Sequence, residues 1–273
     1  MPEGHTLHRL AREHQRLFGG EVVHAASPQG RFAAGASAID GTELVRAEAY
    51  GKHLFHHYGA PGNPSGGGPL LHIHLGLYGK FTTGAGEPPE PRGALRLRLV
   101  GGGHWTDLRG PTACELVDED AVAALLGRLG PDPLHARSDP ARAFQKLHRS
   151  RTPVAALLMD QSVVAGIGNV YRAELLFRHR LDPMRPGRSV PAELWDAMWA
   201  DLVTLMRAGV RSGRIVTVRE EDRPPGKRRL TREEAVYVYR RTGLPCRVCG
   251  TPVRTAVLVG RNLFWCPRCQ APE

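Results

Sequence analysis

The chain has 273 residues, of which 41% are hydrophobic, a composition that is typical of a globular protein and excludes a disordered one. Its formal net charge is +10 and its sequence pI is about 9.9. No apolar run is long enough to cross a membrane, and Glu3, His5 and Arg9 stand where a secretion signal would be apolar. We therefore predict a cytoplasmic protein, with two domains because its length exceeds the usual single-domain size.

The excess positive charge is concentrated in two segments. Residues 137–151 hold five Lys and Arg against one acid, and residues 205–245 hold eleven against five. A cationic surface is often only a solubilising one, but an uneven charge also suits DNA or RNA, whose neutralised phosphates release counterions.

The first half of the chain predicts one helix followed by an antiparallel sheet. Residues 4–18 place apolar side chains on one helical face, and Gly19-Gly20 ends the helix. Short apolar runs with glycine-rich breaks predict six strands: residues 21–25, 44–50, 53–58, 70–75, 94–100 and 113–117. Glycine- and proline-rich loops, residues 59–69 and 83–92, lie between strands. This pattern is typical of a β-sandwich or barrel.

The second half is predicted to be helical. A helix over residues 121–130 leads into a turn-rich segment, residues 130–140, where we place the domain boundary. Apolar periodicity then predicts four helices: residues 141–148, 154–160, 170–179 and 192–206. The basic segment 207–232 contains Pro224-Pro225-Gly226 and lacks apolar periodicity, so we predict a loop there.

Residues 157–178 carry the most informative motif of the helical half. Two predicted helices flank the turn Gly166-Ile167-Gly168, and Asn169 is expected to be the N-cap of the second helix. Free N–H groups at a helix N-terminus attract anions, and glycines let a phosphate approach the backbone closely. The alternative is an ordinary helical hairpin whose glycines serve packing.

Four of the five cysteines form two close pairs. Cys246 and Cys249 are followed after sixteen residues by Cys266 and Cys269, and each pair can present two thiolates to one ion. This spacing predicts one structural zinc ion, because four protein ligands leave no open position for catalysis. Two redox CxxC motifs are the alternative, but the βαβ context of such motifs is missing.

The segment between the two cysteine pairs predicts a β-hairpin. Residues 255–258 and 262–265 would form its strands, with Gly260-Arg261 at the tip. An arginine there is suited to phosphate contact, although a solvated turn charge explains it equally well. The fifth cysteine, Cys114, lies in an apolar strand and is expected to be an inert core residue.

Together these motifs resemble the formamidopyrimidine-DNA glycosylase and endonuclease VIII family of bifunctional DNA glycosylases and AP lyases. The resemblance rests on MPEG at the N-terminus, Gly51-Lys52, the segment LLMDQSVVAGIGNVYRAELL and the hairpin ending GRNLFWCPRCQ. It implies an α+β multidomain fold, in which an N-terminal β-sandwich catalytic domain spans residues 1–128, a helix-two-turn-helix domain spans residues 129–235 and a zinc finger spans residues 236–273. It also implies a bacterial enzyme of base excision repair that acts as a monomer on damaged double-stranded DNA, without a nucleotide cofactor or a membrane.

The resemblance also implies roles for single residues. Pro2, freed by removal of Met1, would be the nucleophile, and Glu3 the acid or base beside it. Lys52 would donate a proton during strand cleavage. The residues implied to contact DNA are Arg128, Asn169 and, at the phosphate of the lesion and in cleavage, Arg261. Without the resemblance, Lys52 would be interpreted as a solvated strand-end charge and Glu3 as an acid of the first helical turn.

The loop over residues 74–79 favours the endonuclease VIII branch and therefore oxidised pyrimidines. Leu77 and Tyr78 resemble the pair that in this branch fills the gap left by a flipped base. Residues 108–111, LRGP, do not match the Arg-Phe wedge of the other branch. Gly76 departs from the glutamine of the wedge loop, which leaves opposite-base contacts open. Thr6 departs from a second N-terminal glutamate, which leaves the support of a Pro2 intermediate open.

The N-terminal amine suits nucleophilic chemistry. An α-amino group titrates near about 8 and a lysine near about 10.4, so roughly a tenth of the former is unprotonated at neutral pH, against under about a thousandth of the latter. A secondary amine gives an iminium at the sugar C1′, and its positive charge acidifies the C2′ proton for β-elimination and a possible δ-elimination. A non-enzymatic, zinc-containing nucleic-acid-binding protein is the alternative function, but it would not need Pro2 or Glu3. A relative that has lost activity is disfavoured because Pro2, Glu3 and Lys52 are all present.

Overall fold

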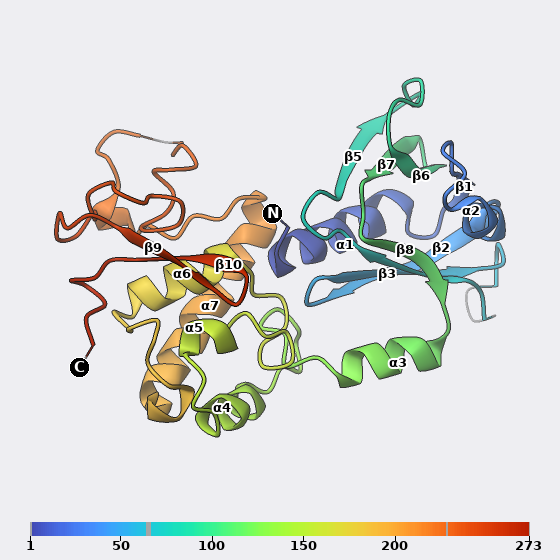
Figure 1. Cartoon of the computed structure of the whole chain (residues 1–273). Coiled ribbons are helices and arrows are strands. Elements are labelled where there is room, and N and C mark those ends of the chain that lie inside the picture. Colours follow the sequence, from blue (N-terminus) through green and yellow to red (C-terminus); the bar gives the residue numbers. More distant parts are fainter. Residues whose placement is uncertain (1, 64–66, 228, 273) are drawn as a thin grey trace. The chain divides into compact units, whose positions relative to one another are not determined.

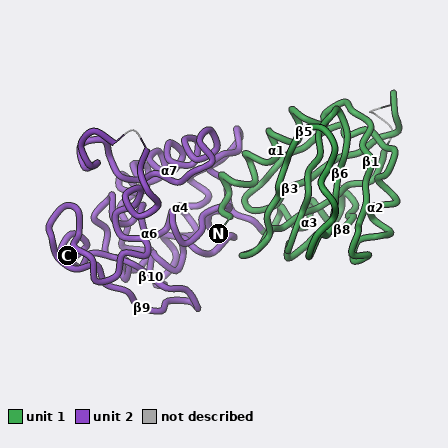
Figure 2. The backbone as a smooth tube through the Cα atoms, turned by 90° about the horizontal axis from the view of Figure 1, so that it is seen from above, with its two compact units in different colours: residues 1–128 green, residues 129–273 purple. Residues whose placement is uncertain are grey.

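The computed structural model describes residues 2–63, 67–227 and 229–272. The chain forms two compact units, which Figure 2 draws in different colours. Unit 1 is residues 1–128 and unit 2 is residues 129–273. Among the residues described, no helix is long and apolar enough to cross a membrane.

Unit 1 is built on an eight-stranded sheet in which every pairing is antiparallel (Figure 1). Its strands are β1 (Val22–Ala26), β2 (Thr42–Tyr50), β3 (His53–Gly59), β4 (Leu70–His74), β5 (Lys80–Ala85), β6 (Leu95–Gly101), β7 (His104–Arg109) and β8 (Ala113–Val117). Their order is β5-β7-β6-β1-β2-β3-β4-β8, so β1 joins the two halves. Leu54 from one half and Leu99 from the other belong to one hydrophobic core, which confirms the predicted antiparallel sandwich.

Helix α1 (Gly4–Phe18) covers part of this core. It packs on β2 and β3 and buries Leu7, Leu17 and Phe18. Full burial of one such side chain stabilises the folded protein by about 1.5–3 kcal/mol. The apolar stripe is therefore the main reason why the helix packs on the sheet. The chain leaves the helix through Gly19 and Gly20, and Gly20 has a positive φ of 79°.

Three elements of unit 1 are missing from the sequence prediction: helix α2 (Ala33–Ile39) and strands β5 and β7. Helix α2 is short and alanine-rich, so only Ala36 and Ile39 reach the core. Strand β7 carries the buried Asp107, whose carboxylate accepts two hydrogen bonds from Arg98 of β6 at 2.7 and 2.9 Å. A buried charged residue interrupts the alternation of apolar and polar residues by which a strand is recognised in a sequence. Because β5 extends to Ala85, the loop predicted from residue 83 begins later.

Helix α3 (Glu119–Gly127) is the last helix of unit 1. The described residues of unit 2 contain four helices: α4 (Pro140–His148), α5 (Val154–Leu157), α6 (Asn169–Arg178) and α7 (Ala192–Ser212). Short 3-10 turns lie at Gly187–Ser189 and Glu220–Asp222. The helices of unit 2 surround one core that includes Tyr171, Leu175, Trp195 and Leu202. Helix α6 is buried over most of its length, so it is the central helix of this unit.

Three predicted features of unit 2 are wrong in detail. Helix α5 ends at Leu157, where the chain enters turns, instead of at residue 160. Helix α7 continues to Ser212 because Gly213 supplies the left-handed residue that ends it, so residues 207–212 are helical and not a loop. Asn169 is the first residue of α6, and Gly168, with an extended backbone, is the N-cap.

Strands β9 (Arg254–Leu258) and β10 (Arg261–Trp265) form the predicted hairpin. Strand β10 packs along α6 (Figure 1). Leu263 joins the helical core, whereas Phe264 lies in a second cluster with Cys246 and Cys266. The hairpin is therefore attached to the helices by apolar packing as well as by its cysteines.

Candidate functional site

The N-terminal residues of unit 1 place a proline beside a buried acid. Pro2 is half-buried, and Glu3 is fully buried at the N-cap position of α1. A carboxylate at a helix N-terminus is favoured by the free N–H groups and the helix dipole. Burial lowers the pKa of His5 to about 4, so this neighbouring imidazole is neutral at pH 7. Removal of Met1 would leave the secondary amine of Pro2 next to this acid, in a partly buried position.

Lys52 lies in the tight turn between β2 and β3. Gly51 has a positive φ of 58°, and Lys52 is half-buried. Burial is the main cause that lowers the pKa of His53 to about 3, and it also lowers the pKa of His74; the nearby charge of Lys52 contributes to both shifts. Both imidazoles are therefore neutral at pH 7.

Leu77 and Tyr78 form an exposed apolar pair in the turn between β4 and β5, with 43% and 85% of their surfaces exposed. The preceding Gly76 has φ +64°, and a Cβ at this position would lie 1.8 Å from Thr112 Oγ1. No larger residue fits without a shift, so the departure from glutamine at this position has a local structural reason. Large exposed side chains on a constrained turn are typical of a contact surface.

Unit 2 brings Asn169 close to the residue that follows Arg261. The side-chain amide of Asn169 donates to the backbone carbonyl of Asn262 at 2.9 Å, and Arg172 donates to the same carbonyl at 3.0 Å. Arg172 is completely buried and also donates to the Asn169 side chain. The N-terminus of α6 and the start of β10 thus form one electropositive group of residues.

Arg172 was not predicted as a site residue. Its position among apolar residues of the predicted helix could have indicated that it is buried and has a specific partner. Gln161 was not predicted either; its side chain accepts from Gly166 N–H at 3.0 Å and donates to the Ile167 carbonyl at 3.0 Å. These two bonds hold the turn before α6, in which Gly166 has φ +90°. The predicted anion site is therefore a fixed turn and not a mobile loop.

Arg128 and Arg261 are both exposed. Arg128 is the C-cap of α3, and Arg261 is the first residue of β10, paired through its backbone with Leu258. Within the part of the chain that the structure describes, neither guanidinium makes a hydrogen bond or an ion pair. Both are free to bind phosphate oxygens.

The four cysteines of the hairpin region converge on one point. Their sulfur atoms all lie within 4.8 Å of one another, and Cys246 and Cys266 are buried. The Sγ atoms of Cys246 and Cys269 are 3.8 Å apart, and those of Cys249 and Cys266 are 3.4 Å apart. Four thiolates at this spacing fit one tetrahedral zinc ion, which is structural because no position is left open. Burial raises the pKa of the remaining thiol, Cys114, to about 12, so it is unreactive.

Glu174 attaches the segment before the first cysteine pair to α6. Its fully buried carboxylate accepts from the backbone N–H groups of Tyr237, Val238 and Tyr239 at 2.7, 2.9 and 2.8 Å. The hydroxyl of Thr217 donates to the same carboxylate at 2.5 Å. Four donors satisfy a charge that would otherwise be costly to bury, so this segment has one conformation.

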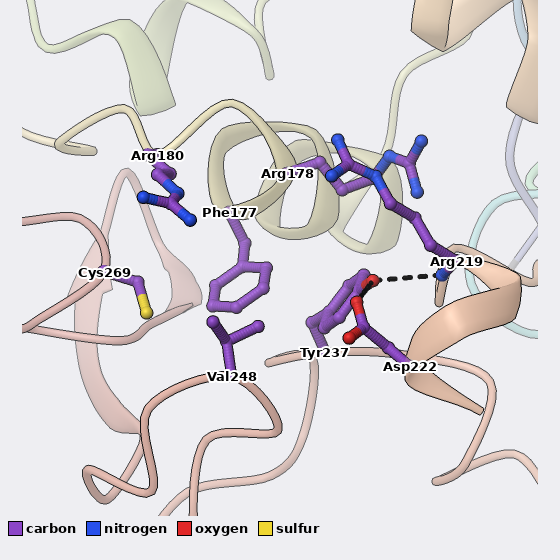
Figure 3. A pocket seen from close by; sticks show the side chains of 8 residues that line it. All are labelled: Phe177, Arg178, Arg180, Arg219, Asp222, Tyr237, Val248 and Cys269. Atoms are coloured by element: carbon purple, nitrogen blue, oxygen red, sulfur yellow. Dashed lines mark hydrogen bonds between the residues drawn. The ribbon is translucent and has the colours of Figure 1, made fainter. Parts of the chain in front are cut away.

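A small pocket of about 50 Å³ lies at the C-terminal end of α6. Its lining residues are Phe177, Arg178, Arg180, Arg219, Asp222, Tyr237, Val248 and Cys269 (Figure 3). The Tyr237 hydroxyl donates to Asp222 at 2.5 Å and accepts from Arg219 N–H at 3.0 Å, and its ring packs on Phe177. These contacts anchor the segment after α7. The pocket lies at the opposite end of α6 from Asn169.

Comparison with known proteins finds three family matches along the chain. The formamidopyrimidine-DNA glycosylase N-terminal domain matches residues 1–114, and the H2TH domain of that enzyme matches residues 129–220. The zinc finger found in FPG and IleRS matches residues 243–272. Endonuclease 8 1 of Mycobacterium tuberculosis is 57% identical over 99% of this chain and 100% of its own length. The formamidopyrimidine-DNA glycosylase of Thermus thermophilus is 35% identical over 75% of this chain and 76% of its own length.

Solved structures share the fold over the whole chain. The MutM (Fpg) protein of Thermus thermophilus superposes with a TM-score of 0.76 at 30% identity and covers 100% of both chains. Lactococcus lactis Fpg in complex with abasic-site DNA superposes with a TM-score of 0.78 at 19% identity, covering 99% of this chain and 100% of its own.

Proposed function

The chain belongs to the formamidopyrimidine-DNA glycosylase and endonuclease VIII family, and we propose from this membership and the arrangement of its site residues how it acts. It is a bifunctional DNA glycosylase and AP lyase of base excision repair, with one structural zinc ion. Its partner is damaged double-stranded DNA, on which it acts as a monomer in the bacterial cytoplasm.

In the proposed reaction Pro2, freed by removal of Met1, is the nucleophile. Its nitrogen attacks C1′ of the damaged nucleoside, the bond from C1′ to the base breaks, and an iminium joins protein and sugar. Glu3, buried beside it, transfers the protons that ring opening and base departure require. The iminium charge then acidifies C2′, whose proton is lost as the 3′ phosphate leaves.

Cleavage also needs groups that bind phosphate. Lys52 donates a proton during elimination, and Arg261 holds the phosphate at the lesion. Asn169 and Arg128 bind further phosphates and keep the duplex in register. Zinc supplies no reacting group, because its four cysteine ligands leave no open position; it holds the hairpin that carries Arg261.

The proposed substrates are oxidised pyrimidines. Leu77 and Tyr78 supply a hydrophobic wedge that fills the space of a base once it has left the stack. The relative that is 57% identical bears the name endonuclease 8, which also supports this branch. A panel of duplexes, each with one defined lesion and scored for base release, tests this choice.

The pairing of half-buried Pro2 with fully buried Glu3 at the N-terminus carries the enzymatic proposal. Borohydride should reduce the iminium and leave the protein covalently bound to DNA that contains an abasic site. An uncleavable N-terminal tag turns the Pro2 nitrogen into an amide and should abolish trapping, whereas Pro2→Gly keeps a free amine and should retain part of it. Full trapping with the tag in place would contradict the assignment of Pro2, with Lys52 as the next candidate.

The second candidate function is a non-enzymatic nucleic-acid-binding protein, which the basic segments of unit 2 would support. Binding of abasic DNA with no trapping by the untagged protein would favour that function.

A further inference from the structure

The turn that joins β9 and β10 holds a valine in an unfavourable backbone conformation. Leu258 and Arg261 are paired across the hairpin, so Val259 and Gly260 form a two-residue turn, with φ values of +50° and +66°. A turn with two positive φ angles is usually built from Asn-Gly, because a β-branched side chain is strained in the left-handed region. The requirements of the turn therefore do not explain why residue 259 is a valine.

Packing within unit 2 does not offset this strain. Val259 is 69% exposed and Val257 is 74% exposed, and among the large apolar side chains of the described residues only Tyr78 is more exposed. Neither valine belongs to the two hydrophobic clusters in the described part of unit 2. Backbone strain of this kind is concentrated at functional sites, so the outlier indicates that Val259 has a partner outside the chain.

The two faces of the hairpin differ in chemistry near its tip. Arg261 shares one face with Leu258, and this face continues through Leu263 into the helical core at the base of the hairpin. Val257 is paired with Asn262 on the opposite face. Val259 follows Val257 by two residues and lies in the turn itself. The tip thus presents a guanidinium on one face and an apolar side chain on the other, with a second apolar side chain at its end.

The charge of the hairpin identifies the class of partner. Residues 254–265 contain two arginines and no acid. The bond from the Asn169 side chain to the Asn262 carbonyl, 2.9 Å long, joins the hairpin to the electropositive N-terminus of α6. A groove of duplex DNA has phosphates along its rim and the C–H groups of deoxyribose along its walls. A cation and apolar side chains on opposite faces of one hairpin can therefore both find partners in such a groove.

We propose that Val257 and Val259 form an apolar DNA contact, packing on deoxyribose of the bound duplex while Arg261 holds a phosphate. The inference rests on the proposed function, in which Arg261 binds the phosphate at the lesion. It explains why the turn keeps a valine where an asparagine would relax the backbone, because the contact made in the complex offsets the strain of the free protein. The valines carry no charge, so their contribution to affinity does not come from counterion release.

Two substitutions that keep the shape of the side chain measure this contact. Val257→Thr and Val259→Thr each replace one methyl group by a hydroxyl. Binding of a duplex with a tetrahydrofuran abasic analogue, measured by fluorescence anisotropy with full-length zinc-loaded protein, should weaken about threefold in each variant and about tenfold in the double variant. These values are expected for loss of about one buried methyl group at each position. The log–log slope of affinity against salt should stay the same, whereas Arg261→Ala should reduce it by about 0.9.

A third substitution separates the contact from the geometry of the turn. Asparagine suits a left-handed φ, so Val259→Asn should raise the unfolding temperature of the zinc-loaded protein. Its affinity for the same duplex should nevertheless fall about threefold, because the apolar contact is lost. Unchanged or higher affinity would show that Val259 only shapes the turn and would overturn the proposal.

Val22→Thr is the matched control, because Val22 is an exposed valine of β1 in unit 1, with 42% of its surface exposed. This change should leave binding unaltered. A threefold loss in the control would assign the effect to a general consequence of the substitution and would overturn the contact. If the double variant loses a self-association that wild type shows by sedimentation without DNA, the tip binds a second copy of the chain, which would also overturn it.

The abasic analogue does not react with Pro2, so these affinities are independent of the iminium chemistry. Borohydride trapping by wild type, together with unchanged binding in the valine variants, would overturn the apolar contact and leave the proposed function intact. Wild-type protein that neither binds the analogue nor is trapped on abasic DNA would instead overturn the proposed function.

Discussion

The two units differ in their buried polar groups: unit 1 buries a set of imidazoles as well as the Arg98–Asp107 ion pair, whereas unit 2 buries charged side chains that bind the backbone. In unit 1, His14 Nδ1 and His56 Nε2 are 3.0 Å apart and His56 bonds Tyr58 at 3.2 Å, all within the core. Burial lowers the pKa of His14 to about 4 and that of His56 well below its usual value, so both are neutral at pH 7.

In unit 2 the buried polar groups are charged and bind the backbone. Arg172 holds the Asn262 carbonyl, and Glu174 holds three successive N–H groups before the first cysteine pair. The imidazoles of His14 and His56, by contrast, have lowered pKa values and take up protons only in acid. The comparison predicts that unit 1 is more sensitive to acid and that unit 2 is more sensitive to loss of its metal.

The largest expected effect is loss of the metal from unit 2. Cys266→Ser removes a fully buried ligand, and because zinc binding is coupled to formation of the hairpin, the metal should be released and lesion cleavage abolished. Hydrogen exchange read by mass spectrometry should show protection lost around β9 and β10 and retained throughout unit 1. Less than one zinc per chain in active wild-type protein would contradict the four-cysteine site.

The next effect separates two steps within unit 1. Replacing both Leu77 and Tyr78 by alanine should slow base excision from duplex DNA about 100-fold, because unstacking a base costs a few kcal/mol and the gap must be filled. Cleavage at a preformed abasic site should change much less. Equal losses of activity on both substrates would show that Leu77 and Tyr78 only stabilise the end of the strand.

Acid should affect unit 1 before unit 2. The folded-state pKa values of His5, His14 and His56 lie below the unfolded value of 6.5, so the unfolded state binds more protons as pH falls. Their contribution to stability is complete above pH 6.5 and is lost as pH falls toward 4. In unit 2 burial opposes ionisation of Asp201, but bonds from His179 and Arg178 lower its pKa to about 2. That contribution is complete above the usual value of 3.8 and is lost only toward pH 2.

Pulse-labelled hydrogen exchange between pH 7 and pH 4.5, corrected for intrinsic rates, measures this difference. Unit 1 should lose protection first, and His56→Gln should flatten its pH dependence because it removes one titrating group. Loss of protection in unit 2 before unit 1 would show that the buried charged groups of unit 2 are more sensitive to acid than the imidazoles of unit 1.

The smallest effect concerns the turn that carries the wedge. Gly76→Ala places a side chain at φ +64°, which costs about 1–2 kcal/mol, and adds a clash with Thr112. Base excision should fall about tenfold, with zinc content unchanged. Gly62→Ala is a matched control, because Gly62 also has a positive φ, at +74°, but has open space around its Cβ and lies away from the wedge. A loss as large in the control would attribute the effect to general strain in unit 1.

Local patterns in the sequence were sufficient for much of this protein. The apolar stripe of residues 4–18 predicted α1, and the spacing of the four cysteines predicted a metal site, because both signals come from residues close in the chain. Strand β7 escaped prediction because its buried polar residue Asp107 is neutralised by Arg98 on another strand. The end of α7 at Gly213 was misplaced because a basic sequence can still be helical when its last turn is capped.

The positions of the site residues were decided only by the tertiary structure. Asn169 and Asn262 are 93 residues apart in sequence yet share a hydrogen bond, and Glu115 reaches His72 across 43 residues. Contacts of this kind depend on strand register and helix packing, which no local pattern encodes. The sequence by itself determined which groups this protein has; its fold decided which of them bind one another, because a hydrogen bond needs two atoms within about 3 Å whatever their separation along the chain.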